Sequence, residues 1–169
     1  MSVYIIAIIL LGLGIALDQY TKYLAVENLK DAPISLVEGV FELHYLENRG
    51  AAFGMLQNKQ VFFLIIGFVL LMIATYLYIK LPKTKRVMPL RICMIFIVCG
   101  AIGNMIDRIR LNYVVDFLYF KLINFPIFNV ADIYVSVFTF ILAALLLFYY
   151  KDEEFDEYFN FKKRINKAE

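Results

Sequence analysis

Two aspartates in an otherwise apolar stretch are the first candidates for chemistry. Asp116 and Asp132 lie near the two ends of "VVDFLYFKLINFPIFNVAD", residues 114–132. An ionised carboxylate is costly to remove from water, so such a stretch keeps two of them only for a reason. Two carboxylates held close together cannot both be ionised at neutral pH, and one then serves as an acid while the other serves as a base. That division of roles is what the hydrolysis of an amide bond requires.

Two amides accompany these acids at helical spacing. Asn129 precedes Asp132 by three residues, so both side chains reach the same space if a helix begins before Asn129. Asn104 and Arg108 in "CGAIGNMIDRIR" are four residues apart and share a helix face. Helix packing and an arginine that reaches the membrane surface would explain much of this motif. They explain Asn104 less well, because an amide deep in an apolar helix needs a hydrogen-bond partner.

The motif "ENRGAAFGM" offers a further amide and two glycines. Asn48 can both donate and accept hydrogen bonds, and Gly50 and Gly54 permit tight turns or positive φ. The residues would form either an ordinary turn before an apolar helix or a backbone ledge that holds an extended peptide. Periodicity alone leaves these two interpretations even.

The motif "DQYTK" places Asp18 and Lys22 four residues apart, with the acid on the N-terminal side. This is a favourable spacing for an ion pair on a helix. The simpler interpretation is a salt bridge at the edge of the membrane.

Other catalytic classes find little support in the residue types. The chain has one histidine, His44, and its two cysteines, Cys93 and Cys99, lie six residues apart in an apolar stretch. No cluster has the ligand spacing of a zinc site, so neither a metal nor another cofactor is expected. The cysteines would lie on different faces of a helix and cannot pair, which favours their interpretation as small apolar core residues.

The elements that must position these residues are membrane-spanning helices. Of the 169 residues, 62% are hydrophobic and 19% are charged, against about 45–50% and 25% in soluble domains. The sequence predicts an all-α membrane protein, one domain of residues 1–169. Its four spans lie at about residues 3–26, 61–79, 90–108 and 130–150. The net charge of +2 gives no reason to expect a nucleic-acid partner.

Basic residues predict the orientation of these spans. Five lie in the link at residues 80–91 and five more in the tail at residues 151–169. Both segments should face the cytoplasm, with both termini inside. Residues 27–60 then lie outside, where "ISLVEGVFELHYLEN" predicts a small β element on the membrane surface with a turn at Gly39. This topology gathers four acids near the outer surface of the bilayer: Asp18, Asp107, Asp116 and Asp132.

In order along the chain, these motifs resemble the bacterial lipoprotein signal peptidases, also called type II signal peptidases. The resemblance rests on "DQYTK", "ENRGAAFG", "GAIGNMIDR", "VVDF" and "FNVAD" and covers nearly all of the chain from Asp18 to Asp132. Each motif is weak alone, but five in order on four predicted spans form a strong signal.

The resemblance implies an aspartic endopeptidase of the bacterial cytoplasmic membrane, with its active site near the outer face. Its substrates would be prolipoproteins cut just before a diacylglyceryl-modified cysteine, and its inhibitors would include the cyclic lipopeptide globomycin. The catalytic pair falls on Asp116 and Asp132. The supporting residues fall on Asn48, Gly50, Asn104, Arg108, Asn129 and Asp18.

Two alternatives remain at this stage. The first is a small proton-coupled transporter that uses the aspartates as a relay, although transport sites usually lie near the middle of the membrane and between repeats. The second is a membrane scaffold in which Asp116 and Asp132 pair with Arg108 and Arg110.

The orientation can be tested with single-cysteine variants. Positions 48 and 119 should react with an impermeant thiol reagent on intact cells, whereas position 83 should react only after the cells are opened, because the basic link faces the cytoplasm. Labelling of position 83 from outside would show that the protein has the opposite orientation.

Overall fold

Four long helices form the body of the protein. The computed structural model describes residues 3–50, 57–151 and 154, and within these ranges four helices are long and apolar enough to cross a membrane. The helices are α1 (Val3–Asn28), α2 (Gln60–Lys80), α3 (Met88–Leu111) and α4 (Val130–Ala144). The expected number of long apolar helices is therefore confirmed.

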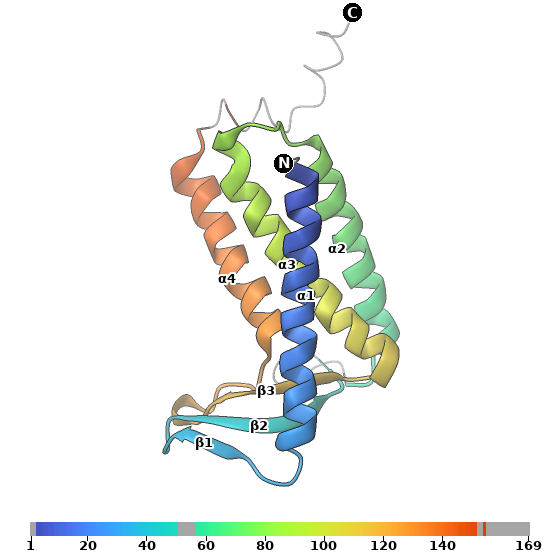
Figure 1. The fold of residues 1–169 in the computed structure, drawn as a ribbon, viewed down its shortest axis with the longest axis vertical. Helices are drawn as coiled ribbons and strands as arrows, with labels where there is room; N and C mark the ends of the chain where they lie inside the picture. The colour runs from blue at the N-terminus through green and yellow to red at the C-terminus, as the bar shows by residue number, and fades with distance from the viewer. Residues whose placement is uncertain (1–2, 51–56, 152–153, 155–169) are drawn as a thin grey trace, which may run out of the picture.

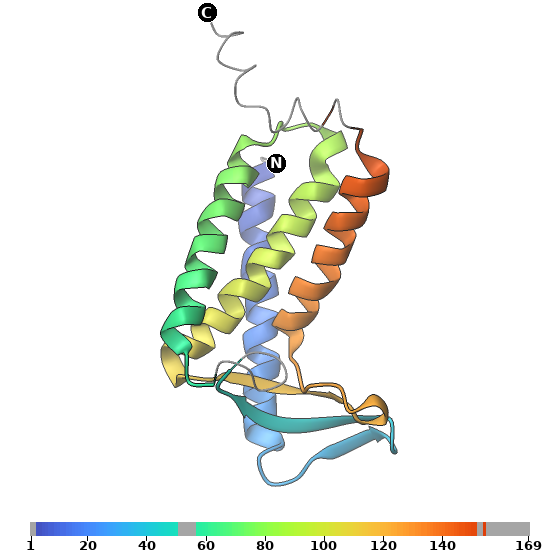
Figure 2. The same cartoon turned by 180° about the vertical axis from the view of Figure 1, so that it is seen from behind.

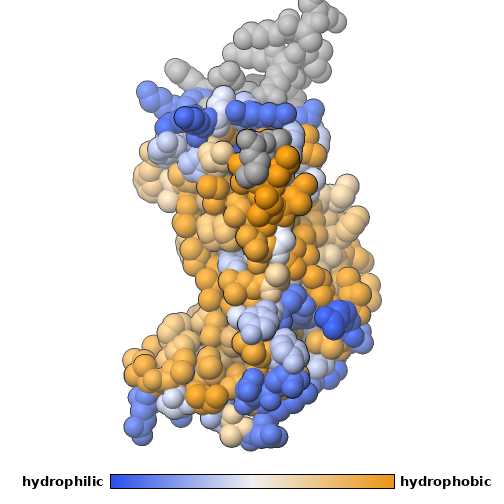
Figure 3. Space-filling model, viewed as in Figure 1, coloured by the Kyte–Doolittle hydropathy of each residue, from blue (hydrophilic) through white to orange (hydrophobic). Residues whose placement is uncertain are grey.

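Helix α3 is the centre of this bundle, because it packs against α1, α2 and α4. A 3-10 turn, η2 (Lys85–Val87), leads into it, and a π-helical turn, η4 (Leu145–Tyr149), extends α4. The N-terminus of α1 and the end of η4 lie at the same end of the bundle (Figure 1). On the face shown in Figure 3, hydrophobic residues cover the middle of the bundle, and hydrophilic ones gather at that end.

A three-stranded antiparallel sheet lies across the opposite end of the bundle (Figures 1 and 2). Its strands are β1 (Ile34–Val37), β2 (Phe41–Asn48) and β3 (Val114–Phe120), in that spatial order. Gly39, with φ of +70°, turns the chain between β1 and β2, as the sequence predicts. A 3-10 turn, η3 (Lys121–Ile123), follows β3.

The third strand corrects the sequence prediction, which drew the β element from residues 27–60 alone and assigned no strand to the apolar stretch that begins at Val114. Val114 to Phe117 are all buried, so this strand lacks the alternation of apolar and polar residues that marks a half-exposed strand. Pairing with β2 places Asp116 opposite Leu46, and Val114 opposite Asn48. The sheet thereby carries Asp116 to the end of the helices.

Close contact between α3 and α4 fixes the position of the second aspartate. A Cβ atom on Gly100 would meet the carbonyl oxygen of Ala131 and would lie 2.7 Å from Val135 Cγ2. Only a glycine therefore lets the first turn of α4 approach α3 this closely.

We expect Gly100→Ala to destabilise the protein by about 1–3 kcal/mol, because the added methyl group meets backbone that cannot move away. Cys93 and Cys99 are buried and are the two cysteines of the chain, so a thiol-reactive fluorescent dye reports unfolding during a thermal ramp. The control is Gly12→Ala, where a Cβ atom has no neighbour within 4 Å. An unchanged midpoint for Gly100→Ala would contradict the close packing.

Candidate active site

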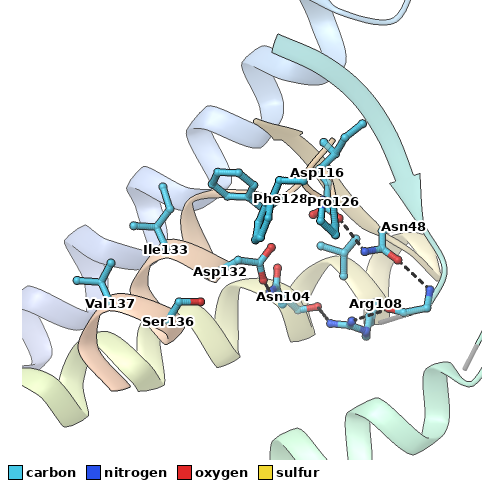
Figure 4. A pocket seen from close by; sticks show the side chains of 14 residues that line it. Asn48, Asn104, Arg108, Asp116, Pro126, Phe128, Asp132, Ile133, Ser136 and Val137 are labelled. Carbon is cyan, nitrogen blue, oxygen red and sulfur yellow. Dashed lines mark hydrogen bonds between the residues drawn. The ribbon is translucent and has the colours of Figure 1, made fainter. Parts of the chain in front are cut away.

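A cavity of about 450 Å³ opens where the sheet meets the ends of α3 and α4. The polar side chains on its wall come from four elements (Figure 4). Asn48 lies at the end of β2, Asp116 in β3, Asn104 and Arg108 in α3, and Asp132 in α4. The rest of the wall is mostly apolar. The two aspartates at the ends of the 114–132 segment thus face one cavity.

Asp116 is almost completely buried, at 1% exposure, and both of its carboxylate oxygens accept amide hydrogen bonds. Asn48 Nδ2 donates to Oδ2 at 2.7 Å, and Asn129 Nδ2 donates to Oδ1 at 2.6 Å. Burial raises the pKa of Asp116 to about 7, and the nearby charge of Asp132 adds to this increase. The two amide hydrogen bonds partly oppose it. Asp116 therefore changes its protonation state near neutral pH.

Asp132 is held by the start of its own helix and by α3. Its Oδ2 accepts from the Asn129 backbone N–H at 3.2 Å, while Asn129 Oδ1 accepts from the Asp132 backbone N–H at 3.0 Å. This reciprocal pair is a capping box. Asn104 Nδ2 donates to Asp132 Oδ1 at 2.8 Å.

The sequence brings Asn129 and Asp132 together only if a helix begins before Asn129, and the structure differs from that condition. Helix α4 begins at Val130, and Asn129 is its N-cap with an extended backbone. The three-residue spacing still brings Asn129 and Asp132 together, because an N-cap side chain reaches the third helical residue.

The amide of Asn104 has one orientation that satisfies its neighbours. Its Oδ1 accepts from Lys22 Nζ at 2.9 Å and from Asn129 Nδ2 at 3.1 Å. Lys22 Nζ and Asn129 Nδ2 can donate hydrogen bonds but cannot accept them, so the Asn104 oxygen must face both groups. Its NH₂ group is then directed to Asp132.

A buried ion cluster lies directly behind the cavity. Lys22 pairs with Asp18 at 3.0 Å and with Asp107 at 2.9 Å, which confirms the predicted pair and adds a second acid. Gln19 Nε2 also donates to Asp107 Oδ1, at 2.9 Å. Asp18 does not line the cavity. It reaches the site through the backbone N–H of Ala131, which donates to its Oδ1 at 2.9 Å.

Arg108 and Gly50 join α3 to the end of β2. The Arg108 guanidinium lies 4.8 Å from the centre of the Phe63 ring and donates to the carbonyl oxygens of Asn104 and Gly50, at 3.3 and 3.5 Å. The Gly50 N–H donates to Asn48 Oδ1 at 3.0 Å, so Asn48 closes a tight turn. Residues 51–54 of the predicted ledge lie outside the described residues.

The scaffold interpretation required ion pairs between the site aspartates and arginines. Among the residues that the structure describes, neither Asp116 nor Asp132 forms a salt bridge with Arg108 or Arg110. In the same ranges, no group of three or more His, Cys, Asp or Glu side chains could hold a metal ion.

Two features of the site do not follow from the motifs in the sequence. Ser136 lines the cavity one turn beyond Asp132, and its spacing of four residues would have revealed it. The contact between Lys22 and Asn104 joins residues 82 positions apart, and no local pattern signals such a pairing.

Comparisons with known proteins give one consistent result. The family model described as signal peptidase (SPase) II matches residues 9–148. The lipoprotein signal peptidase of Caldanaerobacter subterraneus is 47% identical over 146 residues, which cover 84% of this chain and 96% of that protein. That of Clostridioides difficile is 43% identical over 148 residues, covering 86% and 95%.

A solved structure agrees with these sequence relatives. A bacterial membrane enzyme determined by the in meso method at 2.3 Å resolution is 28% identical, covers 83% of this chain and 87% of its own, and superposes with a TM-score of 0.75. The transporter interpretation finds no support among these relatives. On the length and identity of these matches, the chain belongs to the signal peptidase II family.

Proposed function

We propose that Asp116 and Asp132 are the catalytic pair of an aspartic endopeptidase that cuts diacylglyceryl-modified prolipoproteins just before the lipidated cysteine. The family assignment makes the chain a membrane protease that removes signal peptides from prolipoproteins. The observation that supports this assignment of the chemistry is the cavity, in which two carboxylates from separate elements are each held by amide donors.

In the proposed mechanism the two carboxylates share one proton. The ionised carboxylate takes a proton from a water molecule, whose oxygen attacks the carbonyl carbon of the scissile bond. The protonated carboxyl group gives its proton to the carbonyl oxygen. When the intermediate collapses, the C–N bond breaks and the first carboxyl group gives its proton to the leaving amine. The other carboxylate takes back a proton from a hydroxyl group of the intermediate as the new carboxyl product forms, so the pair again holds one proton. The raised pKa of Asp116 supports this scheme, because a carboxyl group must stay protonated near neutral pH to act as the acid.

The supporting residues hold the pair in place. Asn48 and Asn129 fix the Asp116 carboxylate, Asn104 fixes that of Asp132, and the contact of Arg108 with Gly50 joins α3 to the turn after β2. Asp18 acts from behind the cavity through Ala131. The mechanism needs no metal or cofactor, because the two carboxylates carry every proton transfer.

We further propose that the cavity lies at the outer face of the bacterial cytoplasmic membrane, and that both termini are cytoplasmic. The basic residues between α2 and α3 support this orientation. The sheet would then lie on the outer membrane surface, which its exposed apolar residues favour; Ile34, Leu36 and Val37 of β1 are each about half exposed. Residues 1–169 would act as one peptidase domain.

The apolar wall of the cavity fits a lipidated substrate. Pro126, Phe128, Ile133 and Val137 line it beside the aspartates, so acyl chains and an apolar signal peptide can stay in contact with apolar groups while the scissile bond reaches the carboxylates. A cyclic lipopeptide such as globomycin combines a peptide with an acyl chain, and we expect it to occupy the same cavity.

We expect Asp116→Asn and Asp132→Asn each to lower kcat by at least about 10²–10⁴-fold, because asparagine can neither accept the proton of the water nor donate one to the carbonyl oxygen. The double variant should be hardly slower than either single variant, since the two groups act as a unit. The assay follows cleavage of a lipidated prolipoprotein by gel shift.

Asp31→Asn, which alters an exposed acid in the loop between α1 and β1, is the matched control and should cleave at the wild-type rate. The thiol-dye assay shows whether the inactive variants are folded. Near wild-type turnover by a folded Asp116→Asn variant would refute the assignment of the pair.

The pH profile of cleavage should be bell-shaped, with its alkaline limb near pH 7 if Asp116 supplies the proton. The Asn48 amide favours the ionised form of Asp116, so its loss should raise the pKa of Asp116. Asn48→Ala should therefore move the alkaline limb to higher pH while lowering the maximum rate. A limb that moves to lower pH, or stays fixed, would mean that another group is the acid.

A further inference from the structure

A hydroxyl group lies on the cavity wall one helical turn beyond Asp132. Ser136 follows Asp132 by four residues, so both side chains lie on the same face of α4, and both line the cavity. Figure 4 shows the Ser136 hydroxyl and the Asp132 carboxylate on the same side of the helix. The lining residues beside it on α4, Ile133 and Val137, are apolar.

The hydroxyl of Ser136 has no hydrogen-bond partner among the residues that the structure describes. A serine inside a membrane helix commonly donates to the carbonyl oxygen four residues earlier, but this one does not. The other polar groups of the wall differ in this respect, because Asn48, Asn104, Asp116 and Asp132 all hydrogen-bond within the protein. Ser136 thus presents a donor to the space where a substrate would lie.

We infer that the Ser136 hydroxyl donates a hydrogen bond to a carbonyl oxygen of the lipidated substrate and so strengthens its binding. The inference rests on the proposed function, in which the scissile bond lies at Asp116 and Asp132. One helical turn rises about 5.4 Å, so the partner lies a short distance from the scissile bond, on the side where α4 enters the apolar layer.

Two parts of the substrate carry a carbonyl oxygen within that reach. One is an ester of the diacylglyceryl group, which is attached to the cysteine beside the scissile bond. The other is a peptide carbonyl of the signal peptide, a few residues before that bond. Both are hydrogen-bond acceptors, and both lose contact with water as they enter an apolar cavity. A hydroxyl donor at this depth replaces the lost water contact.

Binding can be measured without cleavage in the Asp116→Asn background. The probe is a fluorescent synthetic peptide that carries the end of a signal peptide and a diacylglyceryl-cysteine, titrated into the full-length protein in lipid nanodiscs. Adding Ser136→Ala should weaken binding about 3- to 10-fold, as expected for the loss of one neutral hydrogen bond. In the otherwise wild-type enzyme, Ser136→Ala should raise KM by the same factor and leave kcat unchanged.

Two controls isolate the hydroxyl. Thr139→Val removes a hydroxyl from the same helix outside the cavity wall and should leave binding unchanged. Ser136→Thr keeps the hydroxyl and should retain most of the affinity.

A second probe with ether-linked chains, which lack the ester carbonyls, identifies the acceptor. If Ser136→Ala weakens binding of the ester probe but not of the ether probe, the partner is an ester of the lipid. Equal weakening for both probes identifies a peptide carbonyl.

If neither probe loses affinity in Ser136→Ala, the inference is wrong. The proposed function would survive that result, because it depends separately on the loss of cleavage in Asp116→Asn.

Discussion

The three N–H groups of Lys22 determine how the rest of the site is arranged. This ammonium group is buried, at 3% exposure, and it contacts Asp18, Asp107 and Asn104, each at about 3 Å. A buried charge is tolerated only when it is paired and hydrogen-bonded. Because Lys22 donates to Asn104 Oδ1, the NH₂ group of that amide turns to Asp132. The ion cluster therefore sets the hydrogen bonding of a carboxylate that it does not touch.

The helices must approach closely for this arrangement to exist. A Cβ atom on Gly103 would collide with the Asp18 carboxylate, just as one on Gly100 would collide with Ala131. These two glycines, three residues apart on α3, admit α1 on one side and the start of α4 on the other. The Ala131 N–H donates to Asp18, so the first turn of α4 is fixed by α1 as well as by its own capping box.

The sequence predicts the parts of this structure that depend on local spacing. The apolar runs predict four helices, and the i,i+4 spacing predicts the ion pair of Asp18 and Lys22. The turn at Gly39 is predicted because a glycine interrupts a stretch of residues typical of β-strands. The sequence does not predict β3, because a strand buried on both faces has no alternation. Local sequence patterns also do not predict the hydrogen bond between Asn48 and Asp116, since it depends on the register of β2 against β3.

The cavity combines two environments that the proposed reaction needs at the same point. At one end, amides and the ion cluster stabilise Asp116 and Asp132, and at the other, Ile133 and Val137 present an apolar wall. Carboxylates alone would bind the peptide bond of the substrate but not its acyl chains. An apolar groove alone would bind the acyl chains but could not cleave the peptide bond. Because α4 begins at the carboxylate end and continues into the apolar layer, one helix connects both environments. Under the proposed function, a lipid-anchored cysteine can thus bring its peptide bond to the aspartates while its chains remain in the membrane.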